Sequence, residues 1–161
     1  NIAARTPIWM GAVTKVVAIY DSPFWRERGL AGSAMSHVGP LREIHDISDV
    51  NGSFGALFGF SREQITEGTI TAQLAELFGP EAKTPRSIYI KDWSSSKFTS
   101  PPGVHQLNDY QLFGSKVLRE AHCDGHLFFA STETSVDSPG HIEGAFLAAR
   151  RTANSILALI R

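Results

Sequence analysis

The chain has 161 residues, of which 42% are hydrophobic and 19% charged, and this length suits one domain or two small lobes with packed cores. Its 15 basic and 16 acidic side chains give a formal net charge of -1, so charge provides no reason to expect nucleic acid or an anionic membrane as a partner. The single cysteine, Cys123, excludes an internal disulfide, and no apolar run approaches the roughly 20 residues that span a bilayer. We therefore expect a globular protein and assign it to the cytoplasm. Asn1 stands where an initiator Met would, which suggests a fragment or a processed chain.

Short strands and turns dominate the first third of the chain. A β-branched, apolar run predicts a strand at residues 12–20, and a short aromatic and charged turn of helix or loop follows at 24–28. Two weaker strands are expected at 31–38 and 41–47. The apolar run at 55–60 predicts another strand, whose glycines indicate close packing by a neighbour.

A helix and a further strand are expected in the middle of the chain. Ser61 is predicted to cap the helix, with Gln64 as its capping-box partner. Apolar residues recur at helical spacing from 69 to 78, and Gly79-Pro80 stops the helix. The alternating pattern at 87–93 then predicts a strand.

The last third predicts a strand, a loop and a long helix. The short apolar run at 127–130 is typical of a buried strand in a parallel sheet, and a polar loop follows it. A helix is expected at 141–160, with an apolar stripe formed by Ile142, Ala145, Phe146, Ala149, Ala153, Ile156 and Ile160. Such a layout presents free backbone N–H groups to an anionic or electron-rich ligand, and Gly140 and Gly144 would permit close approach. Without further information, an ordinary capped strand–turn–helix unit is the more frequent explanation.

Lys15 is the main candidate for chemistry. Period-two alternation places it with Val13 and Val17 on one face of the first strand. A lysine buried among valines would need a partner and would have a lowered pKa, which favours a functional role. The alternative is a lysine on the solvated face of an edge strand.

Four groups of segments together carry a resemblance to a known family. They are Met10–Lys15 with Tyr20 and Phe24–Arg26; Gly59-Phe60 with Leu77–Gly79; Asp92-Trp93 with Pro101–Gly103; and Leu127–Ser135 with Gly140–Ala145. The last group is the most specific, because it joins a strand, a Thr-Glu-Thr loop and a Gly-Ala helix start. In this order the segments resemble the C-terminal portion of the flavin-containing monoamine oxidase family, over nearly the whole chain.

The resemblance implies a two-domain flavoenzyme. Residues 1–104 would form part of the substrate-binding domain, and residues 105–161 the C-terminal segment of the FAD-binding domain. The expected fold class is α+β with α/β character: a mixed sheet in the substrate domain, plus the terminal strand and helix of a Rossmann-like FAD domain. The implied reaction transfers a hydride equivalent from an amine or amino acid to the flavin, which O2 reoxidises.

The resemblance also assigns roles on the side of the substrate domain. Lys15 would lie near flavin N5 and hold a water. Trp93 would begin the stretch that crosses the dimethylbenzene edge of the flavin, and Phe98 would line the substrate cavity. His141 would face both the cavity and the cofactor.

The remaining cofactor residues would come from the last loop and helix. His141 and Ile142, after Gly140, would lie beside the flavin pyrimidine edge, where the helix dipole would stabilise negative charge on a reduced flavin. Thr132 and Glu133 would lie near the ribityl and phosphate portion, and Ser131 replaces the glycine that usually precedes them.

Several departures from the family pattern limit these expectations. His141 stands where a cage tyrosine is usual, and residues 94–100 lack the glycine pair and second tyrosine. The flavin-linking cysteine is also absent, so FAD should be non-covalent. No G-x-G-x-x-G occurs, so this fragment would bind FAD incompletely and be inactive alone. A missing N-terminal half or another subunit would then cover its exposed faces, and no histidine spacing indicates a metal site.

Two alternatives to amine oxidation stay open. One is a non-catalytic relic or interaction module that keeps the fold. The other is a flavin oxidoreductase or isomerase of the same superfamily that acts on a non-amine substrate.

Overall fold

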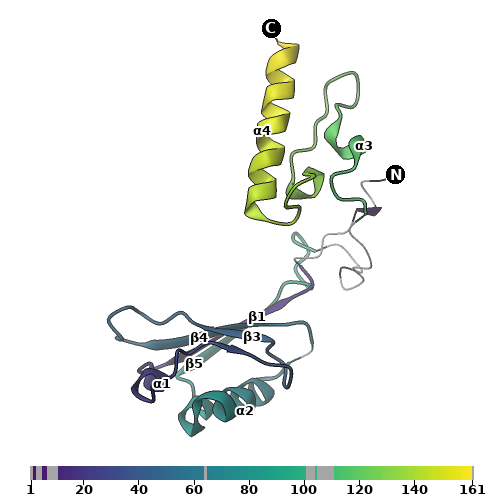
Figure 1. Cartoon of the computed structure of the whole chain (residues 1–161). Helices are drawn as coiled ribbons and strands as arrows, with labels where there is room; N and C mark the ends of the chain where they lie inside the picture. The colour runs from purple at the N-terminus through teal and green to yellow at the C-terminus, as the bar shows by residue number, and fades with distance from the viewer. Residues whose placement is uncertain are drawn as a thin grey trace. The chain divides into compact units, whose positions relative to one another are not determined.

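The computed structural model describes residues 2, 5–6, 11–63, 65–100, 104 and 111–160 and forms two compact units (Figure 1). One unit is Ala12–Ser100, and the other combines Asn1–Gly11 with Pro101–Arg161. Three predicted features, at Met10, Gln64 and Pro101–Gly103, lie outside the described residues. Among the described helices, none has the length and apolar character needed to cross a membrane.

The unit Ala12–Ser100 is built on a five-stranded sheet with the order β2-β3-β4-β1-β5. Its strands are β1 (Thr14–Tyr20), β2 (Ala34–Met35), β3 (Glu43–Asp46), β4 (Gly55–Ser61) and β5 (Ser87–Asp92). These strands confirm the ones predicted for this part of the chain; β4 extends one residue further than predicted, and the other four are shorter. The expected mixed sheet is wrong for the described strands, because every pairing between them is antiparallel. Short connections between consecutive strands β2, β3 and β4 allow only that direction.

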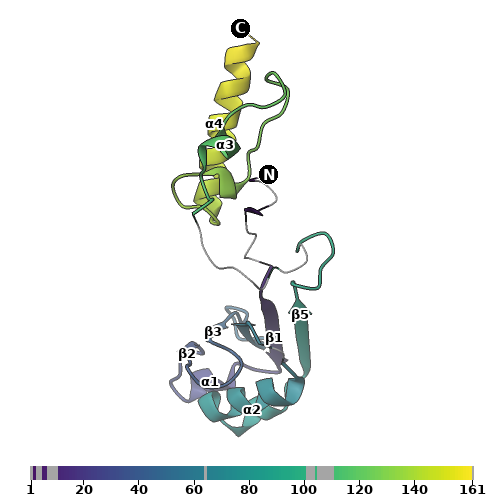
Figure 2. The same ribbon diagram turned by 90° about the vertical axis from the view of Figure 1, so that its right-hand side faces the viewer.

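Two α-helices pack on the same face of this sheet, α1 (Phe24–Glu27) and α2 (Glu67–Phe78), and the short 3-10 helix η2 (Pro80–Lys83) follows α2 (Figure 2). The buried core between sheet and helices consists of Val16, Ala18, Tyr20, Trp25, Leu41, Ile44, Leu57, Ile70, Leu74, Phe78 and Ala82. Alternate residues of β1 enter this core, so the residues between them point to the opposite, more open face.

The start of α2 differs from the prediction. Ser61 does not cap the helix, because it continues β4 and pairs with Thr14 of β1. Thr66 is the cap instead: its hydroxyl accepts a hydrogen bond from the Thr69 N–H at 3.2 Å, and the Thr69 hydroxyl accepts one from the Thr66 N–H at 3.1 Å. The predicted end at Gly79 is confirmed, since its φ of 111° lies in the region that favours glycine.

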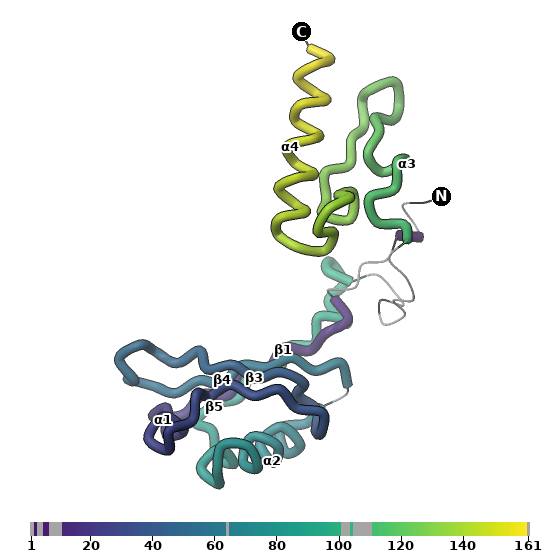
Figure 3. Tube along the Cα trace, viewed as in Figure 1, coloured from purple at the N-terminus to yellow at the C-terminus, as the bar shows by residue number. Residues whose placement is uncertain are grey.

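The second unit contains α3 (Lys116–Arg119), the 3-10 turn η3 (Thr132–Thr134) and the long helix α4 (Ile142–Leu159). Figure 3 traces the segment between α3 and α4 running alongside the long helix. The strand predicted at 127–130 is wrong for the described residues, since only Leu127 forms a bridge, to His122. A strand needs a ladder of partners, and no other described segment pairs with this run.

Helix α4 confirms the predicted helix, one residue shorter at each end, but turns a different face inward. Its buried residues are the small residues Gly144, Ala148 and Thr152. A Cβ placed on Gly144 would lie 2.2 Å from the Ser138 carbonyl oxygen, so the preceding loop packs too closely for a larger residue. The predicted apolar stripe faces outward, with exposed fractions of 78% at Ile142, 69% at Phe146, 40% at Ile156 and 74% at Ile160.

Candidate functional site

Lys15 lies in the middle of the sheet rather than at its edge. Strand β1 pairs with β4 on one side and β5 on the other, so the edge position in the alternative is wrong. The Lys15 side chain is exposed on the face opposite α2, so the solvated position in that alternative is confirmed and the expected burial is wrong. Its ammonium nitrogen lies 4.8 Å from the centroid of the Phe58 ring, within range of a cation–π interaction.

Aromatic side chains from neighbouring strands surround Lys15 on this open face. Phe58 and His45 are directly opposed in β4 and β3, and their rings stack with centroids 5.7 Å apart. Phe58 also meets Phe60 edge to face at 4.7 Å, and Tyr89 of β5 is 61% exposed on the same side. We call Lys15, His45, Phe58, Phe60 and Tyr89 the aromatic face. Such a surface suits flat, apolar or cationic ligand groups.

Sequence reasoning missed most of the aromatic face. The two phenylalanines flank Gly59 with a period of two, a signal that would have placed them on one side of β4. His45 could not have been found in this way, because its position opposite Phe58 depends on the pairing register of two strands.

The first turn of α4 is open. His141 precedes the helix with extended backbone angles, and its side chain does not cap the helix. Instead, its ring Nδ1 lies 2.9 Å from the Pro139 carbonyl oxygen, and Gly140 before it has a φ of +79°. Ile142 is 78% exposed, so side chains do not cover the helix tip. An uncapped helix start offers N–H groups and a positive dipole end to an electron-rich ligand.

Hydrogen bonds hold the Thr-Glu-Thr segment beside the start of α4. The Thr132 hydroxyl donates to the His141 carbonyl at 2.9 Å, which ties the turn η3 to α4. Thr134 is buried, and its hydroxyl donates to the Ser131 carbonyl at 2.8 Å. The Glu133 carbonyl accepts a hydrogen bond of 2.8 Å from the Gly114 N–H, while Ser131 itself is exposed. The structure therefore brings together the loop and helix residues that the sequence assigned to a cofactor.

Trp93 and Phe98 follow β5 on the other unit. Trp93 is 37% exposed, and the Lys91 ammonium lies 5.4 Å from its ring centroid. Phe98 is 95% exposed, so it lines no cavity within its own unit. Lys15, Trp93 and Phe98 thus belong to one unit and the residues from Ser131 to Ile142 to the other, and their meeting in one site stays a prediction.

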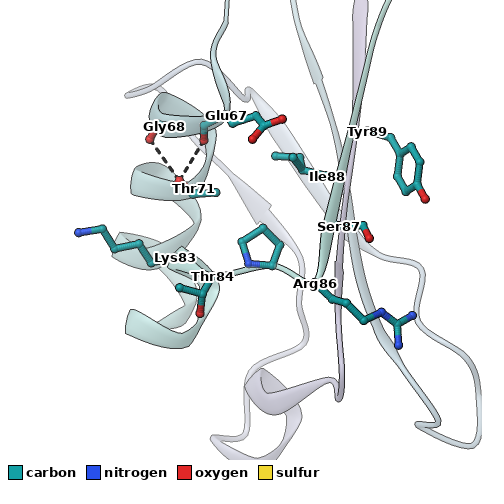
Figure 4. Close-up of a pocket in the computed structure, with 10 residues that line it drawn as sticks. Glu67, Gly68, Thr71, Lys83, Thr84, Arg86, Ser87, Ile88 and Tyr89 are labelled. Carbon is teal, nitrogen blue, oxygen red and sulfur yellow. Dashed lines mark hydrogen bonds between the residues drawn. The ribbon is translucent and has the colours of Figure 1, made fainter.

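A pocket of about 740 Å³ opens between α2 and the start of β5 (Figure 4). Its lining includes Glu67, Thr71, Lys83, Arg86 and Tyr89. The Thr71 hydroxyl bonds within its own helix, donating to the Glu67 carbonyl at 2.9 Å. Of the aromatic face, only Tyr89 lines this pocket, and none of the predicted site residues does. Nowhere in the described ranges do three or more His, Cys, Asp or Glu residues group to hold a metal ion.

The chain is similar to several curated enzymes, two of which are named as flavin-containing. The "Probable flavin-containing monoamine oxidase A" of Dictyostelium discoideum is 30% identical, over 97% of this chain and 36% of that protein. The flavin-containing amine oxidase B of Cavia porcellus is 28% identical, over 98% and 32%. The L-amino acid dehydrogenase of a Synechocystis strain is 27% identical, over 99% and 36%. The chain thus spans about a third of the length of these relatives.

Solved structures of putrescine oxidase and cyclohexylamine oxidase each contain a part with the same fold as this chain. Wild-type putrescine oxidase bound to putrescine matches 91% of the chain with a TM-score of 0.72 and 28% identity, and the match covers 35% of that enzyme. Cyclohexylamine oxidase from Brevibacterium oxydans matches 92% with a TM-score of 0.70 and 25% identity, over 36% of its length. A family model described as flavin-containing amine oxidoreductase matches residues 2–157. With nearly every residue inside that match, the chain belongs to the flavin-containing amine oxidoreductase family.

Proposed function

We propose that the protein to which this chain belongs is an FAD-dependent oxidoreductase that oxidises an amine or an amino acid. The observation that carries this proposal is the open first turn of α4, uncapped at His141 and joined to the Thr-Glu-Thr turn by the Thr132 hydroxyl. Membership of the family gives this geometry its chemical meaning, because a flavin is the group that such proteins hold.

The residues beside the helix tip fit a flavin. Backbone N–H groups at a helix start are hydrogen-bond donors, and the pyrimidine edge of a flavin presents acceptors. Gly140, His141 and Ile142 would hold that edge, and Ser131, Thr132 and Glu133 the ribityl and phosphate portion. FAD supplies the hydride acceptor when it is bound, and the positive helix end stabilises the charge that develops there. Without the flavin-linking cysteine, the binding is non-covalent.

The aromatic face is the second part of the proposed site. Lys15 would hold a water near the reacting bond, and the rings of Phe58 and Phe60 would exclude bulk solvent around it. Trp93 would contact the benzenoid edge of the flavin, while Phe98 and His141 would line the cavity. Putrescine in one similar enzyme and an L-amino acid in the name of another relative support an amine or amino acid as the substrate class.

Further polypeptide is needed to complete the enzyme. In the outward stripe of α4, Phe146 is 69% exposed and Ile160 is 74% exposed. Exposing so large an apolar surface to water is unfavourable. The chain also lacks a glycine-rich nucleotide cradle. We therefore infer that an N-terminal half or another subunit covers this stripe and holds the rest of the FAD, and that the isolated chain is inactive.

The test uses the longer protein that contains this chain. Purified protein should be yellow and show flavin absorbance, and acid precipitation should release all of the flavin into the supernatant. Anaerobic mixing with putrescine, benzylamine or an L-amino acid should bleach the flavin. Subsequent addition of O2 or of a quinone then identifies the electron acceptor, since one relative carries the name dehydrogenase and others the name oxidase.

Other outcomes of this test separate the alternatives. A yellow protein that no amine or amino acid bleaches would indicate a flavin enzyme with a different substrate class. A folded but colourless protein that takes up no FAD would indicate the non-catalytic module and would overturn the proposal.

A further inference from the structure

Arg151 in α4 makes contacts that the proposed chemistry does not use. One terminal nitrogen, Nη1, donates to the Thr134 carbonyl at 2.9 Å, and the other, Nη2, donates to the Phe129 carbonyl at 2.7 Å. Nη2 also lies 3.0 Å from the Thr134 hydroxyl and 3.2 Å from the Thr152 hydroxyl. The planar guanidinium thus binds both ends of the segment from Phe129 to Thr134, which contains the Thr-Glu-Thr turn.

These contacts hold the turn at a second point along α4. The first is the Thr132 hydroxyl bond to the His141 carbonyl at the start of the helix. Arg151 lies nine residues beyond Ile142, which is about 13 Å along the axis at a rise of about 1.5 Å per residue. Because helical side chains lean toward the N-terminus, the arginine reaches back over the buried face of α4. Hydrogen bonds at two separate points along a rigid helix fix both the orientation of the turn and its distance from the helix.

The charge of Arg151 has no carboxylate partner among the ion pairs of the described residues. Burial lowers the pKa of the guanidinium, and the nearby charge of Arg119 lowers it further. Its Nε is buried without a hydrogen-bond partner in the described surroundings. A partly buried cation without a carboxylate partner is unfavourable for stability. The useful property of Arg151 is therefore the planar geometry of its guanidinium, which directs two donors at two carbonyl groups.

We propose that Arg151 is a positioning residue, which sets the Thr132–Thr134 turn against the first turn of α4 in the arrangement that receives the cofactor. The inference rests on the proposed function for the identity of that cofactor, but the positioning itself is a property of this chain. Only arginine supplies two coplanar donors for the carbonyls of Phe129 and Thr134. A lysine keeps the charge as a single point and satisfies one carbonyl at a time.

The decisive comparison uses Arg151→Lys, Arg151→Met and the matched control Arg150→Met, whose arginine is the exposed neighbour on the same helix. Amide hydrogen exchange of the full chain reports on the turn through the N–H groups of Thr134 and Gly114, which bond to Ser131 and Glu133. Both Arg151 variants should exchange these amides about 10-fold faster than wild type, because a charge-assisted bond is lost. Arg150→Met should leave them unchanged.

The flavin-bound longer protein provides the second readout. Arg151→Lys should weaken FAD binding about 10-fold and alter the flavin absorption band, which a purely stabilising residue would leave alone. If wild type takes up no FAD, the proposed function fails, and the exchange data still decide the role of Arg151. The inference would be overturned if Arg151→Lys kept the amide exchange rates and the FAD affinity of wild type. It would also be overturned if Arg150→Met changed these two quantities as much as the Arg151 variants do. Should Arg151→Met not fold, the lysine variant alone decides.

Discussion

At the scale of single residues, the Asp46 carboxylate joins α1 to the end of β3. It accepts hydrogen bonds of 2.9 Å from the indole N–H of Trp25 and from Nε of Arg26, and one of 2.8 Å from the Ser48 N–H. Burial opposes ionisation, but these hydrogen bonds outweigh it and lower the pKa of Asp46 to about 2. The carboxylate is therefore a stabilising charge.

The pH dependence of stability should reveal this carboxylate. Because its folded pKa lies below the unfolded value of 3.8, its contribution is present above that value and is lost as pH falls toward 2. Asp46→Asn should lower the free energy of unfolding near pH 7 by about 1–3 kcal/mol. Urea titrations between pH 7 and pH 2 measure both proteins; the wild-type and variant midpoints should converge at the acid end, and parallel curves would contradict the assignment.

Lys15 provides a prediction for the reaction. Lys15→Met in the longer protein should slow flavin reduction or reoxidation about 100-fold while the protein stays folded, because the side chain is exposed and its removal leaves no cavity. Stopped-flow absorbance measures both half-reactions. Lys83→Met, on the helix-covered side of the unit, is the control and should react like wild type. Unchanged traces for Lys15→Met would remove the lysine from the proposed mechanism.

At the scale of elements, the local patterns predicted most of the structure. The apolar runs of β1 and β4, the alternating run of β5 and the helical spacing of α2 could each be recognised from their own residues. The cap at Ser61 was wrong, because strand pairing with β1 takes that residue and leaves the role to Thr66. The predicted inward face of α4 was wrong, because the close packing of the preceding loop at Ser138 places Gly144 on the buried side of the helix.

The close contact at Gly144 gives a test of that loop packing. Replacing a helical glycine by alanine usually stabilises a helix by about 1 kcal/mol. Gly144→Ala should instead destabilise the chain by about 1–3 kcal/mol, since the new methyl would overlap the Ser138 carbonyl. Gly68→Ala in α2 is the matched control, because its methyl would meet only the Thr66 hydroxyl at 3.8 Å. Thermal melts of both variants should shift in opposite directions, and a stabilised Gly144→Ala would refute the packing.

At the scale of the whole molecule, the residues predicted for the site come from two units of one chain. The loop from Ser131 to Ile142 could be singled out from the sequence because its residues are contiguous and need no tertiary information, while its role toward a cofactor stays a prediction. The aromatic face depends on the pairing register of four strands, β1, β3, β4 and β5. The contacts of Arg151 depend on a helix that packs on a loop. Periodicity in a single sequence contains neither.

The outward stripe of α4 yields a prediction about the longer protein. Phe146→Ser should reduce self-association of the isolated chain, because it removes an aromatic side chain that is 69% exposed. The same change should destabilise the longer protein by about 2 kcal/mol or more, since the ring would be buried there. Light scattering measures the first effect and urea denaturation the second. If the longer protein tolerates the serine without loss, the stripe is not a covered surface.

The central position of β1 has a consequence for how the Lys15 side chain can move. Ladders of hydrogen bonds run along both sides of the strand, to β4 and β5, so the Cα of Lys15 is an immobile anchor. Any adjustment of the ammonium group must come from the four rotatable bonds of its own side chain. The position of the Lys15 ammonium group can therefore change by a few ångströms while its Cα stays in place. A lysine on a mobile loop would lack this property.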